Sequence, residues 1–105
     1  MAFSSERALK LVGKSRSQYQ CNHVVNEVLN ANMNVGGTAN DYKKYGTKVF
    51  VPSAGTVVVG TDGVHVGIFI NAHEFIHSSS SKFQVIKAPL SQLPYVFPKG
   101  YEFRK

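Results

Sequence analysis

The chain has few of the features that mark disulfide-rich, membrane-spanning or metal-binding proteins. It contains 105 residues with one cysteine and no tryptophan, and its six acidic side chains are outnumbered by twelve lysines and arginines. A single cysteine excludes an intramolecular disulfide framework, so packing must supply the stability. No apolar run approaches the roughly 20 residues that cross a bilayer. Neither an HExxH nor a CxxC spacing occurs, and we expect no metal or other cofactor.

Size and composition indicate one globular domain, residues 1–105. Hydrophobic residues make up 43% of the chain and charged residues 17%, with seven phenylalanines and five tyrosines as large core pieces. A chain of this length supports one modest core. The start of the sequence lacks the basic and apolar regions of a signal peptide. We therefore expect a soluble protein that a carrier system secretes or delivers into a target cell.

The net charge of +6 favours contact with anionic polymers or acidic proteins. A solvated basic surface is the simpler explanation, and the charges are spread along the chain rather than clustered. One alternative class of function is a non-catalytic basic binding module. No RNA-binding signature or phosphate-binding loop supports it. We expect a monomer that binds no nucleic acid and makes no integral membrane contact.

Apolar periodicity predicts helices first and strands later, which is an α+β fold. A serine-capped helix is expected up to Val12, with Gly13 as its stop, and a second helix begins at Cys21. Its apolar residues form one stripe, with Asn22, Asn26 and Asn30 on the outer face. After a turn-rich segment, 32–37, Thr38 is expected to cap a short helix. An antiparallel meander follows, with strands predicted at 48–51, 55–59, 64–70, 74–78, 83–87 and 101–104.

Two histidines are predicted to meet across a hairpin. Side chains alternate between the faces of a strand, so His65 and His77 can be directly opposite only if the loop between their strands has an odd number of residues. We predict such a loop at 71–73, or a bulge. His65, Gly67, Phe69, Phe75 and His77 would then share the face toward the cysteine helix, with Gly67 leaving room beside the cysteine. Val66, Ile68, Ile70 and Ile76 would pack behind them.

Cys21, His65 and His77 together supply what acyl transfer needs. The N-terminus of a helix stabilises negative charge and so favours a thiolate nucleophile at Cys21. His65 is the candidate base and later acid, and His77 would hold it by a hydrogen bond. The Cys21 backbone N–H, helped by Tyr19, is the candidate for stabilising an oxyanion. The competing interpretation of Cys21 is a buried, inert thiol, because free cysteines are among the most buried residues.

The two remaining histidines are not candidates for catalysis. His73 lies at the expected loop tip and should be exposed. His23 lies two positions after Cys21, so it points away from the thiol on a helix, and we expect it to make a structural hydrogen bond.

The segment from His65 to His77, HVGIFINAHEFIH, resembles the catalytic hairpin of the NlpC-type papain-like cysteine peptidases. Residues 7–14, 37–42 and 52–58 resemble the family's opening helix, the segment after its cysteine helix and the strand leading into its hairpin. The resemblance implies a papain-like NlpC-type fold with Cys21 as nucleophile, His65 as base and His77 as the polar third residue. Tyr19 resembles the tyrosine that the family places before its cysteine.

The resemblance also implies a class of reaction. Family members commonly cleave amide bonds in the stem peptides of bacterial peptidoglycan, so a cysteine peptidase or amidase is expected, and a bare catalytic domain suggests a delivered toxin or effector with a cognate immunity protein. The family's usual Asp-Cys-Ser-Gly is Gln20-Cys21-Asn22-His23 here. This difference keeps open a second target, a cytoplasmic protein that is cleaved, deamidated or acyl-modified.

Overall fold

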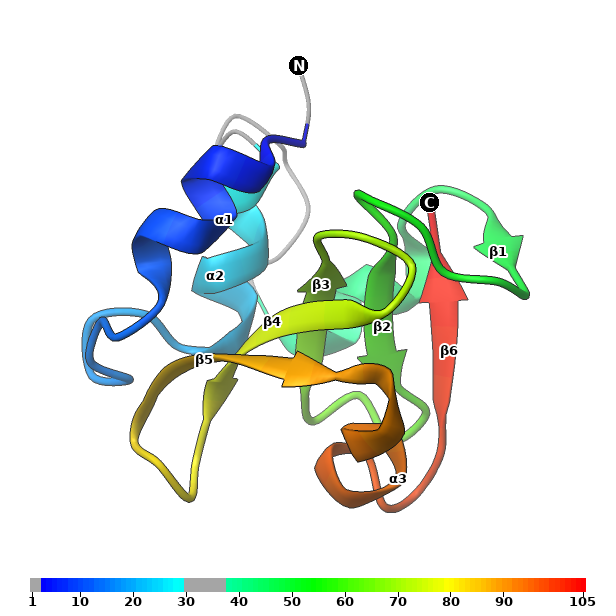
Figure 1. Ribbon diagram of the computed structural model, residues 1–105. Coiled ribbons are helices and arrows are strands. Elements are labelled where there is room, and N and C mark those ends of the chain that lie inside the picture. Colours follow the sequence, from blue (N-terminus) through cyan, green and yellow to red (C-terminus); the bar gives the residue numbers. More distant parts are fainter. Residues whose placement is uncertain (1–2, 30–37) are drawn as a thin grey trace.

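The computed structural model describes residues 3–29 and 38–105, which form an α+β fold (Figure 1). Two α-helices, α1 and α2, come first and lie together beside an antiparallel sheet of six strands, and a 3-10 helix, η1, precedes that sheet. The elements are α1 Ser5–Leu11, α2 Cys21–Val28, η1 Ala39–Lys44, β1 Lys48–Val49, β2 Val57–Gly60, β3 Val66–Phe69, β4 Glu74–Ser79, β5 Gln84–Pro89, η2 Leu90–Gln92, α3 Leu93–Val96 and β6 Tyr101–Arg104.

The strand order, β1-β6-β2-β3-β4-β5, is more complex than the predicted meander. Strands β2 to β5 do follow one another as neighbours. The last strand, β6, returns to pair with both β1 and β2, so it fills the gap between them. All pairs are antiparallel, which confirms the predicted fold class.

The two long helices begin where the sequence predicts. The Ser4 side chain accepts a hydrogen bond from the Arg7 amide at 3.2 Å and caps α1. Just after α1, Gly13 adopts a φ of 92°, which a glycine tolerates best. Cys21 is the first residue of α2, and Val24, Val25 and Val28 are buried on its inner face as predicted.

The predicted outer face of α2 is wrong at the positions that the structure describes. Asn22 is buried, with 8% of its surface exposed, and Asn26 is half-buried and accepts a hydrogen bond from the Tyr42 hydroxyl. Tyr42 of η1 therefore contacts Asn26, a position that the sequence pattern assigned to solvent. Asn30 and the turn-rich segment 32–37 lie outside the described residues.

Each face of the sheet has its own core. On one face, Val57 and Val59 of β2, with Val66 and Ile68 of β3, pack with the apolar side chains of α1 and α2. On the other face, Phe69 and Phe75 pack with Leu93 and Phe97 in and after α3. Because both faces are covered at the centre of the sheet, all four residues of β2 and all four residues of β3 are buried.

The second cover was missed by the sequence analysis. A turn of 3-10 helix, Leu90–Gln92, leads into α3, and Pro94 lies in the first turn of α3, where a proline is tolerated.

The first strand was predicted too long. Phe50 and Val51, which were assigned to it, are 82% and 75% exposed beyond the end of β1.

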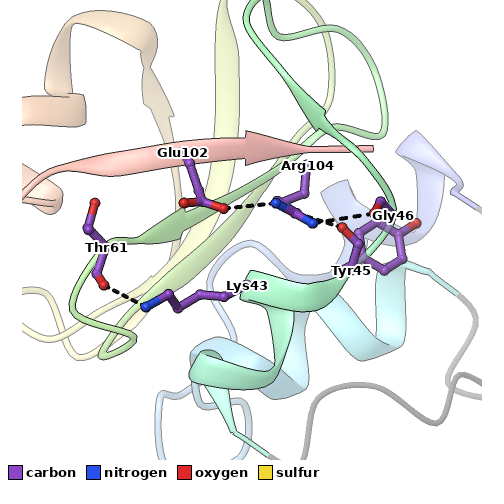
Figure 2. A network of polar contacts seen from close by, with 6 residues as sticks. All are labelled: Lys43, Tyr45, Gly46, Thr61, Glu102 and Arg104. Carbon is purple, nitrogen blue, oxygen red and sulfur yellow. Dashed lines mark hydrogen bonds and ion pairs between the residues drawn. The ribbon is translucent and has the colours of Figure 1, made fainter.

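Polar contacts fasten η1 to the sheet (Figure 2). Arg104, the last residue of β6, donates from Nε to the Tyr45 carbonyl oxygen at 2.7 Å and pairs with Glu102 at 3.1 Å. Lys43 Nζ donates to the Thr61 carbonyl oxygen at 2.9 Å. These contacts hold the region around η1 next to the turn that follows β2.

None of the helices within residues 3–29 and 38–105 has the length and apolar character required to cross a bilayer.

Candidate active site

The structure brings the two predicted histidines together. Nε2 of His65 and Nδ1 of His77 are 3.0 Å apart, and their rings meet edge to face with centroids 5.2 Å apart. One of these nitrogens must carry the hydrogen and the other must accept it. If His65 donates from Nε2, its Nδ1 keeps a lone pair that can accept a proton.

The loop between the strands has the predicted odd length, but the register is offset by two residues. Phe69 pairs with Phe75, and Ile68 with Ile76, across a three-residue loop at 71–73. This register places Gly67, rather than His65, opposite His77. The histidines therefore meet diagonally.

Gly67 has a different role from the predicted one. A Cβ at Gly67 would lie 2.9 Å from the Ile76 carbonyl oxygen and 3.2 Å from the His77 Cβ. The glycine therefore leaves room for the His77 strand and not for the cysteine.

The predicted facing of the hairpin is wrong. Gly67, Phe69, Phe75 and His77 alternate with the residues that pack on α2, so they face the layer formed by α3 and Phe97. The His65 ring lies 5.4 Å from the Phe97 ring, centroid to centroid. Val66, Ile68 and Ile76, which were expected to pack behind, are the residues that contact the cysteine helix layer.

A tight turn fixes His65 just before β3. The Gly60 amide donates to the His65 carbonyl oxygen at 2.9 Å, and the Val64 amide donates to the Asp62 carboxylate at 3.1 Å. Gly63 takes a φ of 73° within this turn. His65 therefore lies at the end of the sheet, beyond the ladder that confines residues 66–69 to one face or the other.

Desolvation keeps both imidazoles neutral at pH 7, with His77 buried and His65 half-buried. Desolvation lowers the pKa of His65 to about 4, with the Arg16 charge lowering it further and Asp62 opposing both. Desolvation also lowers the pKa of His77 to about 3, with His65 and Arg16 adding to the effect. Nε2 of His77 is buried and has no hydrogen-bond partner within the described part of the chain. A buried group without a partner for a charged form resists protonation.

Cys21 lies next to this pair through Val64. The thiol is at the N-terminus of α2 and 7% exposed, and its Sγ donates to the Val64 carbonyl oxygen at 3.9 Å. Val64 directly precedes His65 in the chain. The recorded partner of the thiol is thus this carbonyl and not an imidazole, among the residues that the structure describes.

Tyr19 is half-buried and packs against the core cluster that contains Cys21. That position is close to the start of α2, and the structure records no polar contact from the Tyr19 hydroxyl to a described residue. His73 is exposed at the loop tip, as predicted. His23 is exposed on α2, so the predicted structural hydrogen bond is not supported.

A cleft with a volume of about 670 Å³ opens beside the histidines. Its lining includes Val64, His65 and His77 together with Arg16, Lys82 and the serine run 79–81. Arg16 donates from Nη1 to both the carbonyl oxygen and the hydroxyl of Ser78.

Arg16 was not predicted as a site residue from the sequence. It is one of twelve basic residues and has no motif around it. Its place beside the histidines depends on a tertiary contact, because the segment before the cysteine helix pairs with the edge strand β5 at Ser15 and Gln84. Such pairing cannot be read from one sequence.

Within residues 3–29 and 38–105, no group of three His, Cys, Asp or Glu side chains is arranged to hold a metal ion.

No protein-family model matches the chain, and no curated protein matches it. Among solved structures, NlpC1 from Trichomonas vaginalis is similar, with a TM-score of 0.71 over 96% of this chain and 17% sequence identity. This chain spans 42% of the length of that one. The predicted fold is thereby confirmed: the chain has an NlpC-like α+β fold, and at this identity the likeness concerns the fold alone.

Proposed function

We propose that this protein is a cysteine-dependent peptidase or amidase, with bacterial peptidoglycan stem peptides as its substrate and a role as a delivered antibacterial toxin or effector domain. The observation that carries the proposal is the 3.0 Å contact between the His65 and His77 ring nitrogens. His65 directly follows Val64, whose carbonyl oxygen contacts the Cys21 thiol. The NlpC-like fold supports it, because the solved structure of NlpC1 has a similar fold.

The proposed reaction begins with rotation of the Cys21 thiol from the Val64 carbonyl toward His65. Nδ1 of His65 accepts the thiol proton while Nε2 donates to His77, which holds the ring in that tautomer. The sulfur attacks the amide carbonyl carbon, and the proton on His65 passes to the leaving amine as the C–N bond breaks. Water then attacks the thioester carbonyl carbon while His65 takes a proton from it. The C–S bond breaks, the carboxylic acid product leaves, and His65 returns the proton to the Cys21 sulfur.

Desolvation makes His65 a neutral base in the free protein. Because its pKa is about 4, an imidazolium does not form at pH 7 before substrate arrives. Proton transfer is therefore expected to accompany attack, as in general-base catalysis, instead of preceding it. The N–H groups at the start of α2 are candidates to stabilise the oxyanion, with Tyr19 beside them.

The test is mass spectrometry of peptidoglycan sacculi incubated with wild-type protein, Cys21→Ala and His65→Gln. New peptide ends with wild type alone would support the proposal and identify the bond. His73→Gln is the matched control, because it changes an exposed histidine outside the pair, and it should release the same products as wild type. Products from Cys21→Ala would refute a cysteine mechanism, and no products from folded wild type would refute the wall substrate.

A second target uses the same chemistry. The residues around the thiol, Gln20-Cys21-Asn22-His23, differ from the usual pattern of the wall peptidases, and His23 is exposed beside the start of α2. A cytoplasmic protein that is cleaved, deamidated or acyl-modified is therefore the alternative. Cys21-dependent mass changes in the proteins of a cell extract, with sacculi left intact, would favour it.

An immunity protein is the partner proposed for a toxin. The chain carries a net charge of +6, so an acidic inhibitor that covers the cleft would be attracted electrostatically. Co-expression of such an inhibitor should abolish the Cys21-dependent products.

A further inference from the structure

The cleft beside the histidines is lined by cations and no carboxylates. All of its lining residues are described by the structure, and they include Arg16, Lys82 and Lys87 but neither Asp nor Glu. Lys87 has a partner at the surface, the Glu74 carboxylate at 3.5 Å. Arg16 and Lys82 make no ion pair with any residue in the described ranges.

Arg16 is held in place at both its backbone and its side chain. Its amide donates to the Phe83 carbonyl oxygen at 3.2 Å. Two residues earlier, the Lys14 carbonyl oxygen accepts a hydrogen bond from the Val85 amide at 2.9 Å. Its Nη1 donates to buried Ser78 on β4. The Nε and Nη2 groups meet no acceptor among the residues that the structure describes. A fixed guanidinium with free N–H groups is suited to a planar anion.

Lys82 lies on the rim of the same cleft. Its amide donates to the Ser79 hydroxyl oxygen at 3.1 Å, and the hydroxyls of Ser79 and Ser81 are 3.2 Å apart, which shapes the turn after β4. The Lys82 side chain is exposed and can approach an anion that is bound at Arg16.

We propose that Arg16 and Lys82 bind a carboxylate of the substrate, so that the cleft accepts an acidic peptide next to the amide that is cleaved. This inference rests on the proposed function of the Cys21 and His65 site and adds a specificity determinant to it. Arg16 lowers the pKa of both histidines. A carboxylate bound to Arg16 would offset that effect and make His65 a stronger base in the complex than in the free protein.

The test compares alkylation of Cys21 by iodoacetate and by iodoacetamide, which are nearly isosteric and differ in the carboxylate. Cys21 is the single cysteine, so each rate reports one site. The ratio of the iodoacetate rate to the iodoacetamide rate in the urea-unfolded chain gives the relative reactivity of the two reagents toward Cys21 without the cleft. We expect the folded protein to raise this ratio about fivefold to tenfold, the size of one screened charge contact.

Variants assign the effect to the two cations. Arg16→Gln should return the ratio toward the unfolded value, and Lys82→Gln, which removes an exposed charge and preserves the turn, should lower it in part. Lys44→Gln removes an equal charge outside the cleft and should leave the folded ratio unchanged. An unchanged ratio in both cleft variants would overturn the proposal. The absence of Cys21 alkylation by iodoacetate or by iodoacetamide in the folded protein would overturn it as well. Hydrolysis of sacculi is not measured here, so the outcome is separate from that of the proposed function.

Discussion

Desolvation of His65 and His77 should make the protein lose stability below neutral pH. In the unfolded chain a histidine binds its proton near pH 6.5, whereas the folded values are about 4 for His65 and about 3 for His77. The unfolded state therefore holds more protons in this interval, so the stabilisation is complete above pH 6.5 and is lost as pH falls toward the folded values.

Integrating the proton difference from pH 8 to pH 4.5 gives a loss of about 2.5 kcal/mol for each histidine, or about 5 kcal/mol for the pair. Domains of this size have a total free energy of unfolding of roughly 5–15 kcal/mol, so the effect is large. Urea unfolding followed by circular dichroism at several pH values measures it.

The informative variant is His77→Asn, whose side-chain oxygen can still accept from His65 Nε2. Carboxylates also titrate in this range, so the quantity to compare is the change in free energy between the two pH values and not the stability at one pH. We expect this change to be about 2.5 kcal/mol smaller in His77→Asn than in wild type. The control His73→Gln, at an exposed position, should behave as wild type. Equal losses in wild type and His77→Asn would refute the assignment of a buried neutral imidazole at His77.

Two further predictions concern the packing around the site. Gly67→Ala should lower the free energy of unfolding by about 1–3 kcal/mol, because the new methyl group would lie 2.9 Å from the Ile76 carbonyl oxygen. The His77 ring signals in NMR spectra should shift as well. Unchanged stability would mean that β3 and β4 can separate freely. Tyr42→Phe removes the hydroxyl that donates to Asn26 and should cost about 1–2 kcal/mol in urea unfolding at pH 7. Burial raises the pKa of Tyr42, so above pH 10 the unfolded chain releases the hydroxyl proton before the folded protein does, and wild type should lose stability. Tyr42→Phe should lose less stability over the same pH range. Equal alkaline losses in the two proteins would count against the buried hydroxyl.

The sequence predicted which residues of the hairpin lie on the same side of the sheet. It did not predict whether that side faces α2 or α3. Alternation along 65–77 and an odd loop suffice to place His65 and His77 together. Choosing the face toward α2 needs a contrast between an apolar and a polar side, and β3 has none, because Val66 and Ile68 on one side and Phe69 on the other are all buried. The cover on the second side is a four-residue helix, Leu93–Val96, which is too short to give a periodic signal.

The positions of Cys21 and His65 at the starts of their elements follow from this two-sided sheet. Cys21 belongs to a helix on one face, and the His77 ring lies on the other, so the sheet separates them along most of its length. Side chains from opposite faces can meet only where the ladder ends. Cys21 is the first residue of α2, and His65 directly precedes β3, so both lie at such an end, with the Val64 carbonyl as the recorded link between them. Any reaction that needs both the thiol and the imidazole must therefore take place at this end of the sheet, where the cleft lined by Val64 and His65 opens.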